Sequence, residues 1–334
     1  MKINKRILYS LGIIAVLLIY LLVSGDRKSE DIIDVKSWEG EADEIVINKE
    51  DKPIRIYKKE DKWVIDAAAY PADDSIVSQL IEKMKELKII DFISRKEHYQ
   101  RYDLSQDKAI RVTVSKENEI LRDVLVGKKS PAGRSSYIKF FEKPEIYLAS
   151  GWLINDYNKS VEDIRDKKIY EISEDAVESI ELNYNRKKIS FSKVLDLKKK
   201  DDSDQDIKDK DKVKIDKKKN EDKWICNEYK NVELDNNKVK SFVTDAISIR
   251  ANSFPNIDIK TLRKPESIVS IKALGRSIDL KLFHKGKEKD DEKMYICSSS
   301  ESPYVFTLSE WKAKKFLKSL SDFVVKTKKK KVKK

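Results

Sequence analysis

Apolar and polar residues alternate through residues 44–66, which read EIVINKEDKPIRIYKKEDKWVID. A period of two is typical of strands, and the polar breaks NKEDKP and KKED mark the turns between them. The pattern therefore predicts a short antiparallel meander whose third strand carries Trp63. The same order returns later in the chain. Residues 179–194 predict a hairpin, and the phrase DKW reappears with Trp224 on a third strand.

After each of these strands the apolar spacing changes to three and four, which predicts a helix. The two helical segments, residues 72–87 and 234–249, align at a constant offset of 162. Asp73 and Asp235 fall at the same aligned position just before them, where a carboxylate can accept hydrogen bonds from the first N–H groups of a helix. We therefore give both aspartates a capping role and not a catalytic one. The apolar faces consist of Val77, Leu80, Ile81, Met84 and Leu87 in the first helix and Val239, Phe242, Val243 and Ala246 in the second.

The aligned segments continue through further strands and end in a helix. We expect Phe92 and Phe254 in equivalent strands, followed by hairpins over residues 109–127 and 267–286. Each closing helix has an apolar stripe, made of Trp152, Tyr157, Val161 and Ile164 in one and Trp311, Phe316, Leu320 and Phe323 in the other. Aligned apolar positions that recur on strand and helix faces are what a shared core requires. The chain is therefore expected to hold two tandem repeat modules.

An uncharged apolar run from Ile7 to Gly25 precedes both modules and follows Lys2, Lys5 and Arg6. At about 1.5 Å per residue, its length matches a hydrocarbon core of about 30 Å. A cleaved signal peptide is the rival interpretation, but the run exceeds the usual apolar region and no A-x-A-like site follows. Asp26 stands where a lipoprotein would carry its lipidated cysteine. We therefore predict an uncleaved signal anchor with its N-terminus in the cytoplasm.

These patterns predict an α+β fold class, with an N-terminal transmembrane helix followed by two tandem repeat modules. Each module consists of antiparallel strands in a meander with packed helices. The predicted localisation is single-pass in the bacterial cytoplasmic membrane, with both modules on the periplasmic side. The predicted segments are a cytoplasmic N-terminus (1–6), the anchor (7–25), a first module (30–168), a second module (169–325) with a charged disordered insertion (196–222), and a Lys-rich tail (326–334).

The net charge of +12 is concentrated at the two ends of the chain. Three cations precede the apolar run and seven lysines form the tail KTKKKKVKK, so only +2 remains for the body. A folded nucleic-acid binder carries its basic patch on the folded surface, which argues against nucleic acid as a partner. The tail can attract anionic lipid or an envelope polymer, or it can be a solubilising end. Cys226 and Cys297 are the only cysteines, and we expect them to be two buried free thiols; a single disulfide between them is the alternative.

Motifs for catalysis or metal binding are scarce. His98 and His284 have no second His or Cys at ligand spacing, and no G-x-S-x-G or phosphate-binding glycine motif occurs. We expect no cofactor, no metal and no catalytic residue. The best candidate functional loop is VGKKSPAGRSSY at 126–137, where Lys128, Lys129 and Arg134 could contact a phosphate, an acidic sugar or a polymer. A solvated hairpin connection is the alternative.

Scattered motifs along the first module resemble a bacterial family catalogued as domain of unknown function 4340. The resemblance extends more weakly to the second copy, and so over nearly all of the chain after the anchor. It implies a membrane-anchored protein, often encoded beside the components of a gliding-motility-type ABC transporter, with no known enzymatic activity. The family often has Tyr-Gly-Leu and then Pro where this chain has Asp103 and Asp107. The features that carry the resemblance are the anchor helix followed by a strand pair, KWVI, the approach Tyr70–Asp73, YDL at 102–104, VLVGKKSPAGRSSYIKF at 124–140, and IYL at 146–148.

The leading hypothesis is a non-enzymatic, extracytoplasmic accessory or scaffold protein, with integral membrane transporter subunits as partners. It rests on the apolar run, the repeated pattern, the lack of catalytic motifs and the family resemblance. The alternative is a module that binds an envelope polymer such as a glycan. A third hypothesis is an envelope hydrolase with dispersed carboxylates.

Overall fold

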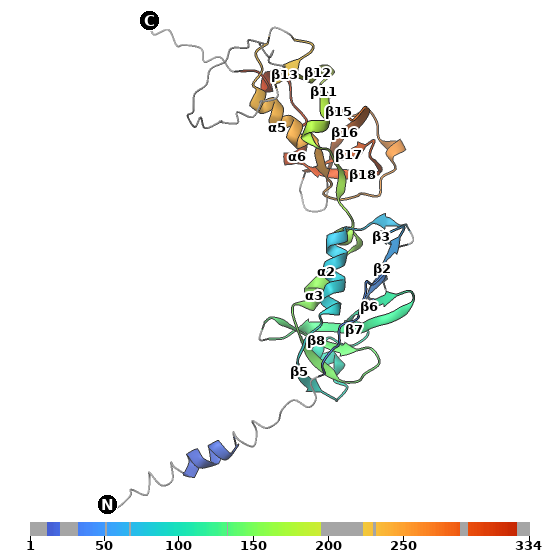
Figure 1. The fold of residues 1–334 in the computed structure, drawn as a ribbon, viewed down its shortest axis with the longest axis vertical. Helices are drawn as coiled ribbons and strands as arrows, with labels where there is room; N and C mark the ends of the chain where they lie inside the picture. Colours follow the sequence, from blue (N-terminus) through green and yellow to red (C-terminus); the bar gives the residue numbers. More distant parts are fainter. Residues whose placement is uncertain are drawn as a thin grey trace, which may run out of the picture. The chain divides into compact units, whose positions relative to one another are not determined.

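The computed structural model describes residues 12–20, 33–50, 52–66, 68–131, 133–194, 223–229, 232–287 and 293–325. The chain forms two compact units that divide between Asp166 and Lys167 (Figure 1). Both are mainly antiparallel sheet with few helices, as expected of the α+β class.

Several predicted segments fall outside the described residues. They are the N-terminus (1–6), the insertion (196–222), the tail (326–334) and most of the anchor (7–25). Residues 12–20 are helical, with their side chains exposed. A search of the described residues finds no helix with the length and apolar character needed to cross a membrane.

The first unit is built on a nine-stranded sheet of order β4-β3-β2-β1-β6-β7-β8-β9-β5. The predicted meander forms β1, β2 and β3, because alternate residues such as Ile45 and Ile47 can then all point into the core. The strands are β1 Glu44–Lys49, β2 Lys52–Lys59, β3 Lys62–Ile65, β4 Tyr70–Pro71, β5 Ile89–Ser94, β6 Ile110–Lys116, β7 Glu119–Lys129, β8 Ser135–Phe140 and β9 Ile146–Ser150.

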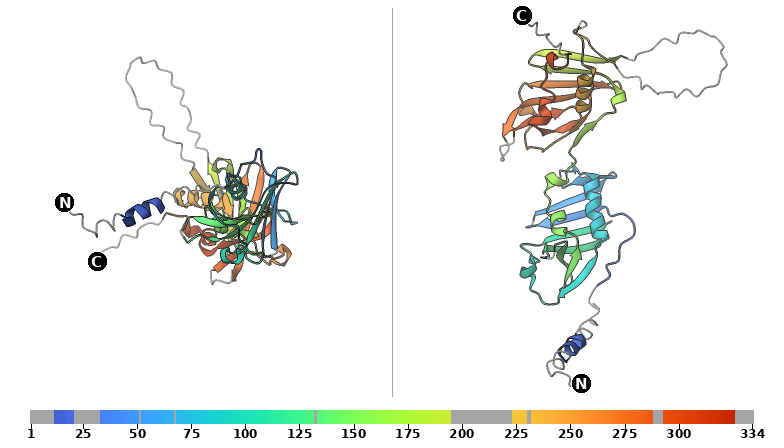
Figure 2. Two further views of the ribbon diagram at one scale, coloured as in Figure 1. Left: turned by 90° about the horizontal axis from the view of Figure 1, so that it is seen from below. Right: turned by 90° about the vertical axis from the view of Figure 1, so that its left-hand side faces the viewer.

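Helix α2 (Asp74–Lys85) runs across the strands of this sheet (Figure 2, right). It begins where predicted, because the Asp73 carboxylate accepts hydrogen bonds from Ser75 N (3.0 Å) and Ile76 N (3.2 Å). Val77, Leu80 and Met84 are buried against the sheet. Burying a side chain of this size contributes about 1.5–3 kcal/mol, so the apolar face fixes the helix on the sheet. The 3₁₀ helix η1 spans Tyr99–Tyr102.

The second unit has a seven-stranded sheet of order β13-β12-β11-β15-β16-β17-β18. Its strands are β11 Val177–Tyr184, β12 Lys187–Val194, β13 Lys223–Cys226, β15 Ser267–Ala273, β16 Arg276–Lys287, β17 Lys293–Ser299 and β18 Ser302–Ser309. Helix α5 (Asn236–Ala246) follows β13 as α2 follows β3, and the Asp235 carboxylate accepts a hydrogen bond from Lys238 N at its start (3.4 Å). Both predicted capping roles are therefore confirmed. The short elements are η2 Glu174–Ala176 and η3 Ile259–Thr261.

The two sheets differ at one edge, and the predicted equivalence of Phe92 and Phe254 is wrong. Phe92 lies on β5, which pairs with β9 at the edge of the first sheet. In the second unit, β14 (Ser248–Arg250) instead pairs with β10 (Lys168–Glu171) in a separate two-stranded sheet. Phe254 lies outside any strand, next to Pro255, which has no N–H group to extend a ladder.

The closing helix is also shorter than predicted, because it is interrupted. In the first unit, α3 (Leu153–Tyr157) and α4 (Val161–Ile164) are separated by a turn. Ser160 accepts from Asp163 N while the Asp163 carboxylate accepts from Ser160 N, and this capping box starts a new helix. In the second unit, α6 (Glu310–Lys314) is likewise followed by η4 (Leu320–Asp322), which begins with the capping box of Ser319 and Asp322.

Each unit has its own hydrophobic core. Tyr157 is fully buried in the first, and its hydroxyl donates a hydrogen bond to Leu80 O (2.6 Å), which ties α3 to α2. In the second, Phe242 contacts three other phenylalanine rings, Phe191, Phe316 and Phe323, at centroid distances of 6.4, 6.3 and 5.3 Å. Cys226 and Cys297 are both free and buried, so the expectation of two buried thiols is confirmed.

Candidate functional site

The three basic residues of the predicted loop belong to different elements. Lys128 and Lys129 are the last residues of β7, and Arg134 ends the turn that leads to β8. This turn is closed by hydrogen bonds from Ser130 N to Ser135 O (2.9 Å) and from Gly133 N to Ser130 O (3.0 Å). The loop is thus shorter than predicted, because β7 continues through both lysines. All three basic side chains are exposed.

Arg134 lines a cleft of about 610 Å³ where the C-terminal end of α2, the end of β9 and the start of α3 meet. Lys129 lies above the ring of Trp152, with its ammonium 5.1 Å from the ring centroid, whereas Lys128 lies outside the cleft. The cleft is lined by Lys83, Glu86, Leu87, Lys88, Arg134, Ser150, Gly151, Trp152, Leu153 and Asp156.

Trp152 is the main apolar surface of this cleft. Its side chain was expected in the core, but the residue is 50% exposed because it precedes α3 instead of lying on the apolar face of that helix. Its indole Nε1 donates a hydrogen bond to Gly133 O (2.9 Å), and Gly151 N donates to Arg134 O (2.8 Å). Gly151 has a φ of 99°, a conformation that glycine adopts without a steric penalty. The ring is therefore held against the β7–β8 turn with part of its surface open to solvent.

An ion pair crosses the cleft beside this ring. The Lys83 ammonium lies 2.5 Å from the Asp156 carboxylate and links α2 to α3. Both side chains are partly exposed, so the pair stabilises the unit by only about 0.2–1 kcal/mol. The charge of Lys83 offsets that of Asp156, which leaves one anion, Glu86, and two cations, Lys88 and Arg134, on the lining of the cleft. Lys129 adds another cation at the Trp152 ring. The cleft is thus a cationic surface around an aromatic ring.

The second unit has a smaller cleft of about 290 Å³ at the corresponding place, between α5, β14 and α6. Trp311 is 66% exposed there, so this tryptophan too was wrongly expected in the core. Lys315 lies 2.6 Å from the Asp245 carboxylate, and its ammonium is 4.1 Å from the centroid of the Trp311 ring. Burial, with smaller contributions from Arg250 and Lys315, lowers the pKa of Lys312 in the same cleft.

The ion pairs of the two clefts join the same elements with opposite polarity. In the first unit the long helix supplies the lysine and the short helix the aspartate; in the second the long helix supplies Asp245 and the short helix Lys315. The polarity decides what lies over the tryptophan. Lys315 is held over the Trp311 ring by its own ion pair, whereas Asp156 in the corresponding place leaves that role to the exposed Lys129.

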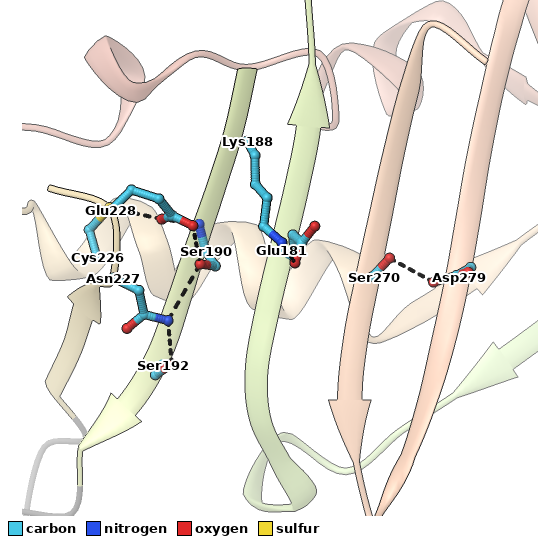
Figure 3. A network of polar contacts seen from close by, with 9 residues as sticks. All are labelled: Glu181, Lys188, Ser190, Ser192, Cys226, Asn227, Glu228, Ser270 and Asp279. Carbon is cyan, nitrogen blue, oxygen red and sulfur yellow. Dashed lines mark hydrogen bonds and ion pairs between the residues drawn. The ribbon is translucent and has the colours of Figure 1, made fainter. Parts of the chain in front are cut away.

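A separate polar network covers the face of the second sheet opposite its core (Figure 3). Glu228 accepts hydrogen bonds from the backbone N–H of Ser190 (2.7 Å), from the Ser190 hydroxyl and from the Cys226 thiol (3.8 Å). Asn227 donates to Ser192 Oγ (2.9 Å), and further along the sheet Ser270 donates to Asp279 (2.6 Å).

The chemistry of this network is that of a brace, not of an activated nucleophile. Burial alone would raise the pKa of Glu228, but the hydrogen bonds from Ser190 outweigh it and lower the pKa, so the carboxylate is a weak base. Burial raises the pKa of the Cys226 thiol, which keeps it protonated at neutral pH. Ser190 and Cys226 therefore both lack the activation that covalent catalysis requires.

The described residues also contain no group of three His, Cys, Asp or Glu side chains that could hold a metal ion. His98 is exposed at the start of η1, and the side chain of His284 lies outside what the structure describes. The clefts beside Trp152 and Trp311 are the features that recur at corresponding places in the described parts of both units.

Residues 63–223 match the model of a family described as Domain of unknown function (DUF4340). Residues 63–223 therefore belong to this family. The match contains the motifs between Trp63 and Leu148 on which the resemblance rests, but not the anchor helix or the strand pair that follows it. Residues 224–325 also fall outside the match. It starts at Trp63 in the first unit and ends in the second unit one residue before Trp224. No curated protein and no solved structure matches the chain.

Sequence reasoning found Arg134 and Lys129 but missed the rest of the cleft. Lys83, Lys88 and Asp156 are charged residues on exposed surfaces, and charges of this kind carry no periodic signal. One signal was present for Trp152, which follows Gly151 just before a helical pattern, where a side chain does not share the buried face of the helix. Trp311 lies in the first turn of α6 and carried no such signal.

Proposed function

We propose that this DUF4340 protein is a membrane-anchored, extracytoplasmic accessory or scaffold protein of an ABC-type transport complex, without enzymatic activity. The observation that carries the proposal is a cleft in each unit that is lined by an exposed tryptophan and crossed by an ion pair between the long and the short helix, with opposite polarity in the two units. Two similar surfaces on one chain suit a protein that holds partners together.

The anchor in this proposal is the apolar run from Ile7 to Gly25. Its described part, residues 12–20, is helical, and residues such as Ile13 and Leu17 expose more than half of their surface. Apolar side chains that pack against nothing in their own chain are expected of a segment whose surroundings are lipid. The three basic residues before the run favour a cytoplasmic N-terminus, with both units outside.

The proposal also includes an origin of the two units as tandem copies. Three features support it besides the offset in sequence. The strand order β3-β2-β1-β6-β7-β8-β9 matches β13-β12-β11-β15-β16-β17-β18 element for element. An aspartate caps the long helix in both units. The capping boxes of Ser160 and Ser319 occupy the same place after the short helix.

Photo-cross-linking in native membranes tests the accessory role. A photoreactive amino acid would replace Trp152 in one variant and Trp311 in another, and the full chain would be purified through a C-terminal tag after irradiation. We expect at least one of the two positions to cross-link to integral membrane proteins, among them a permease or another transport subunit in near-stoichiometric amount. Recovery of the anchored protein without any cross-linked membrane protein at either position would reject the proposal.

A further inference from the structure

The chain enters the first unit beside the C-terminal end of α2. The Arg122 guanidinium donates hydrogen bonds to Lys36 O (2.7 Å) and to Met84 O (3.3 Å), so it fixes the entering segment to the last turn of the helix. Burial lowers the pKa of Arg122, but a guanidinium remains charged at any physiological pH. Trp38, two residues further, lines a cleft together with Glu82 and Lys85 of α2.

The Trp152 cleft lies on the other side of this same turn of α2. Lys83, Glu86 and Lys88 line the Trp152 cleft, whereas Glu82 and Lys85 line the cleft that contains Trp38 of the entering segment. A helix with its side chains is about 10–12 Å across, so the cleft and the point of entry are separated by about one helix diameter.

Only a short stretch of chain separates this end of the unit from the proposed anchor. Residues 26–32 lie between Gly25, at the end of the apolar run, and Ile33, the first described residue of the unit. Fully extended, a chain of this length spans at most about 28 Å. The cleft is therefore on the part of the first unit that the anchor keeps nearest to the bilayer. This step rests on the anchor in the proposed function.

The chemistry of the cleft fits the membrane surface. Tryptophan is enriched at the headgroup level, where one part of the ring is in an apolar environment and another is wet. Trp152 is half-exposed, and Lys88, Lys129 and Arg134 surround it with cations that attract anionic headgroups. Lys128, at the end of β7, adds a further exposed cation next to Lys129. We infer that the Trp152 cleft docks on the phosphate headgroups of the bilayer and so orients the first unit on the membrane.

The second unit supplies a built-in control. Trp311 is also exposed, but Lys315 is held over its ring, and more than a hundred residues separate it from the entering segment. The linker therefore does not hold the Trp311 cleft against the bilayer.

Quenching of tryptophan fluorescence by spin-labelled lipid headgroups tests the inference. The full chain would be placed in nanodiscs of equal parts phosphatidylcholine and phosphatidylglycerol, some of the former carrying a headgroup spin label. The contribution of Trp152 is the difference between the wild type and Trp152→Phe, and that of Trp311 comes from Trp311→Phe. We expect the Trp152 emission to be strongly quenched and the Trp311 emission to be unaffected.

A second arm tests the charges. We expect the double variant Lys88→Gln, Arg134→Gln to reduce the quenching of Trp152 about threefold. We expect the same reduction for the wild type in discs of pure phosphatidylcholine, and in 1 M salt, where the Debye length is about 3 Å. Arg263→Gln with Lys264→Gln removes the same charge from exposed positions of the second unit and should change nothing.

The outcomes separate the inference from the function on which it rests. A chain that does not co-elute with the discs would refute the anchor and the docking together. A chain that co-elutes but leaves Trp152 unquenched would refute the docking alone. Equal quenching of Trp152 and Trp311 would refute it too, as would an unquenched Trp152 whose emission responds instead to a soluble envelope polysaccharide.

Discussion

The two units join a long helix to a short one by an ion pair at the same place, but with the charges exchanged. Lys83 and Asp156 do in the first unit what Asp245 and Lys315 do in the second, at 2.5 and 2.6 Å. The position of the contact is set by the geometry of the helices, and either polarity satisfies it. The polarity does change the surface, because only the ion pair of the second unit holds its own lysine, Lys315, over the neighbouring tryptophan.

The cores differ in a similar way around equivalent helix positions. Leu80 in the first unit accepts a hydrogen bond from the Tyr157 hydroxyl, whereas Phe242 in the second meets Phe316, which has no hydroxyl to offer. One unit therefore ties its helices with a polar contact and the other with a cluster of rings. If the two units fold independently, a change in the hydrogen bond of one or in the ring cluster of the other should affect only the unit that contains it.

The largest expected effect is in the ring cluster. We expect Phe242→Ala to destabilise the second unit by about 3–5 kcal/mol, because it removes a fully buried ring and leaves a cavity among three others. Hydrogen exchange resolved by peptide would show the loss. Protection in peptides of the first unit should remain unchanged, and a matching loss there would show that the two units do not unfold independently.

The buried hydroxyl of Tyr157 gives a smaller effect with a distinct pH dependence. Tyr157→Phe, which copies Phe316, should cost about 1 kcal/mol through the lost hydrogen bond to Leu80 O. Burial raises the pKa of Tyr157 far above its usual value, so the neutral form is favoured in the folded state. This contribution is complete below pH about 10, where tyrosine ionises in the unfolded chain, and is lost as the pH rises further.

Urea unfolding of the wild type and of Tyr157→Phe across the alkaline range would separate the contribution of the hydrogen bond from the effect of tyrosine ionisation. The difference in free energy of unfolding between wild type and Tyr157→Phe should be constant at neutral pH and shrink above pH about 10. A difference that grew with pH would contradict the assignment. Phe316→Tyr is the matched variant in the second unit, and it should be destabilising at all pH values because its new hydroxyl is buried.

The helix caps should also differ between the units. Asp73→Ala is expected to cost about 1 kcal/mol, since its carboxylate accepts from two N–H groups at 3.0 and 3.2 Å. Asp235 accepts one, at 3.4 Å, so Asp235→Ala should cost about half as much. Exchange protection in the first turn of each helix is the measurement. Equal losses in both helices would mean that the longer bond of Asp235 is as strong as the pair at Asp73.

The smallest effect comes from reversing the exposed ion pair. Lys83→Asp or Asp156→Lys alone should cost about 0.5 kcal/mol, and the double variant should recover it, because the second unit has that polarity already. The more informative readout is acrylamide quenching of Trp152. We expect the new lysine to lie over the ring and reduce its accessibility, as Lys315 lies over Trp311. Unchanged accessibility would separate the ion pair from the exposure of the ring.

The sequence predicted those parts of the fold that burial controls. Alternating isoleucines located β1 and β2, and the spacing of Val77, Leu80 and Met84 located α2, because each pattern must match one buried face. Asp73 and Asp235 were predictable as caps because the need for an acceptor recurs at every helix start.

The rest depended on contacts between distant and exposed residues. Lys83 and Asp156 are 73 positions apart, and the exchanged polarity in the second unit hides their equivalence from any alignment that compares identities. The tryptophans were assigned to the core because they extend an apolar stripe, yet Trp152 stands just before α3 begins and Trp311 lies in the first turn of α6. The divergence of β5 and β14 was also hidden, because edge pairing depends on which strand is nearby.

The limits of the family match have a practical consequence for how this chain can be divided. The match runs from Trp63 to Lys223, so it begins within β3 of the first sheet and ends at the first residue of β13 in the second sheet. A fragment cut at those limits would lack β1 and β2, which lie between β3 and β6 in the sheet. Strands β3 and β4 would then have no connection to the rest of the sheet. It would also carry β11 and β12 without the neighbours β13 and β15. The limits of the family match therefore differ from the boundary between the two units, and a cut near Asp166 is the one that keeps both large sheets whole.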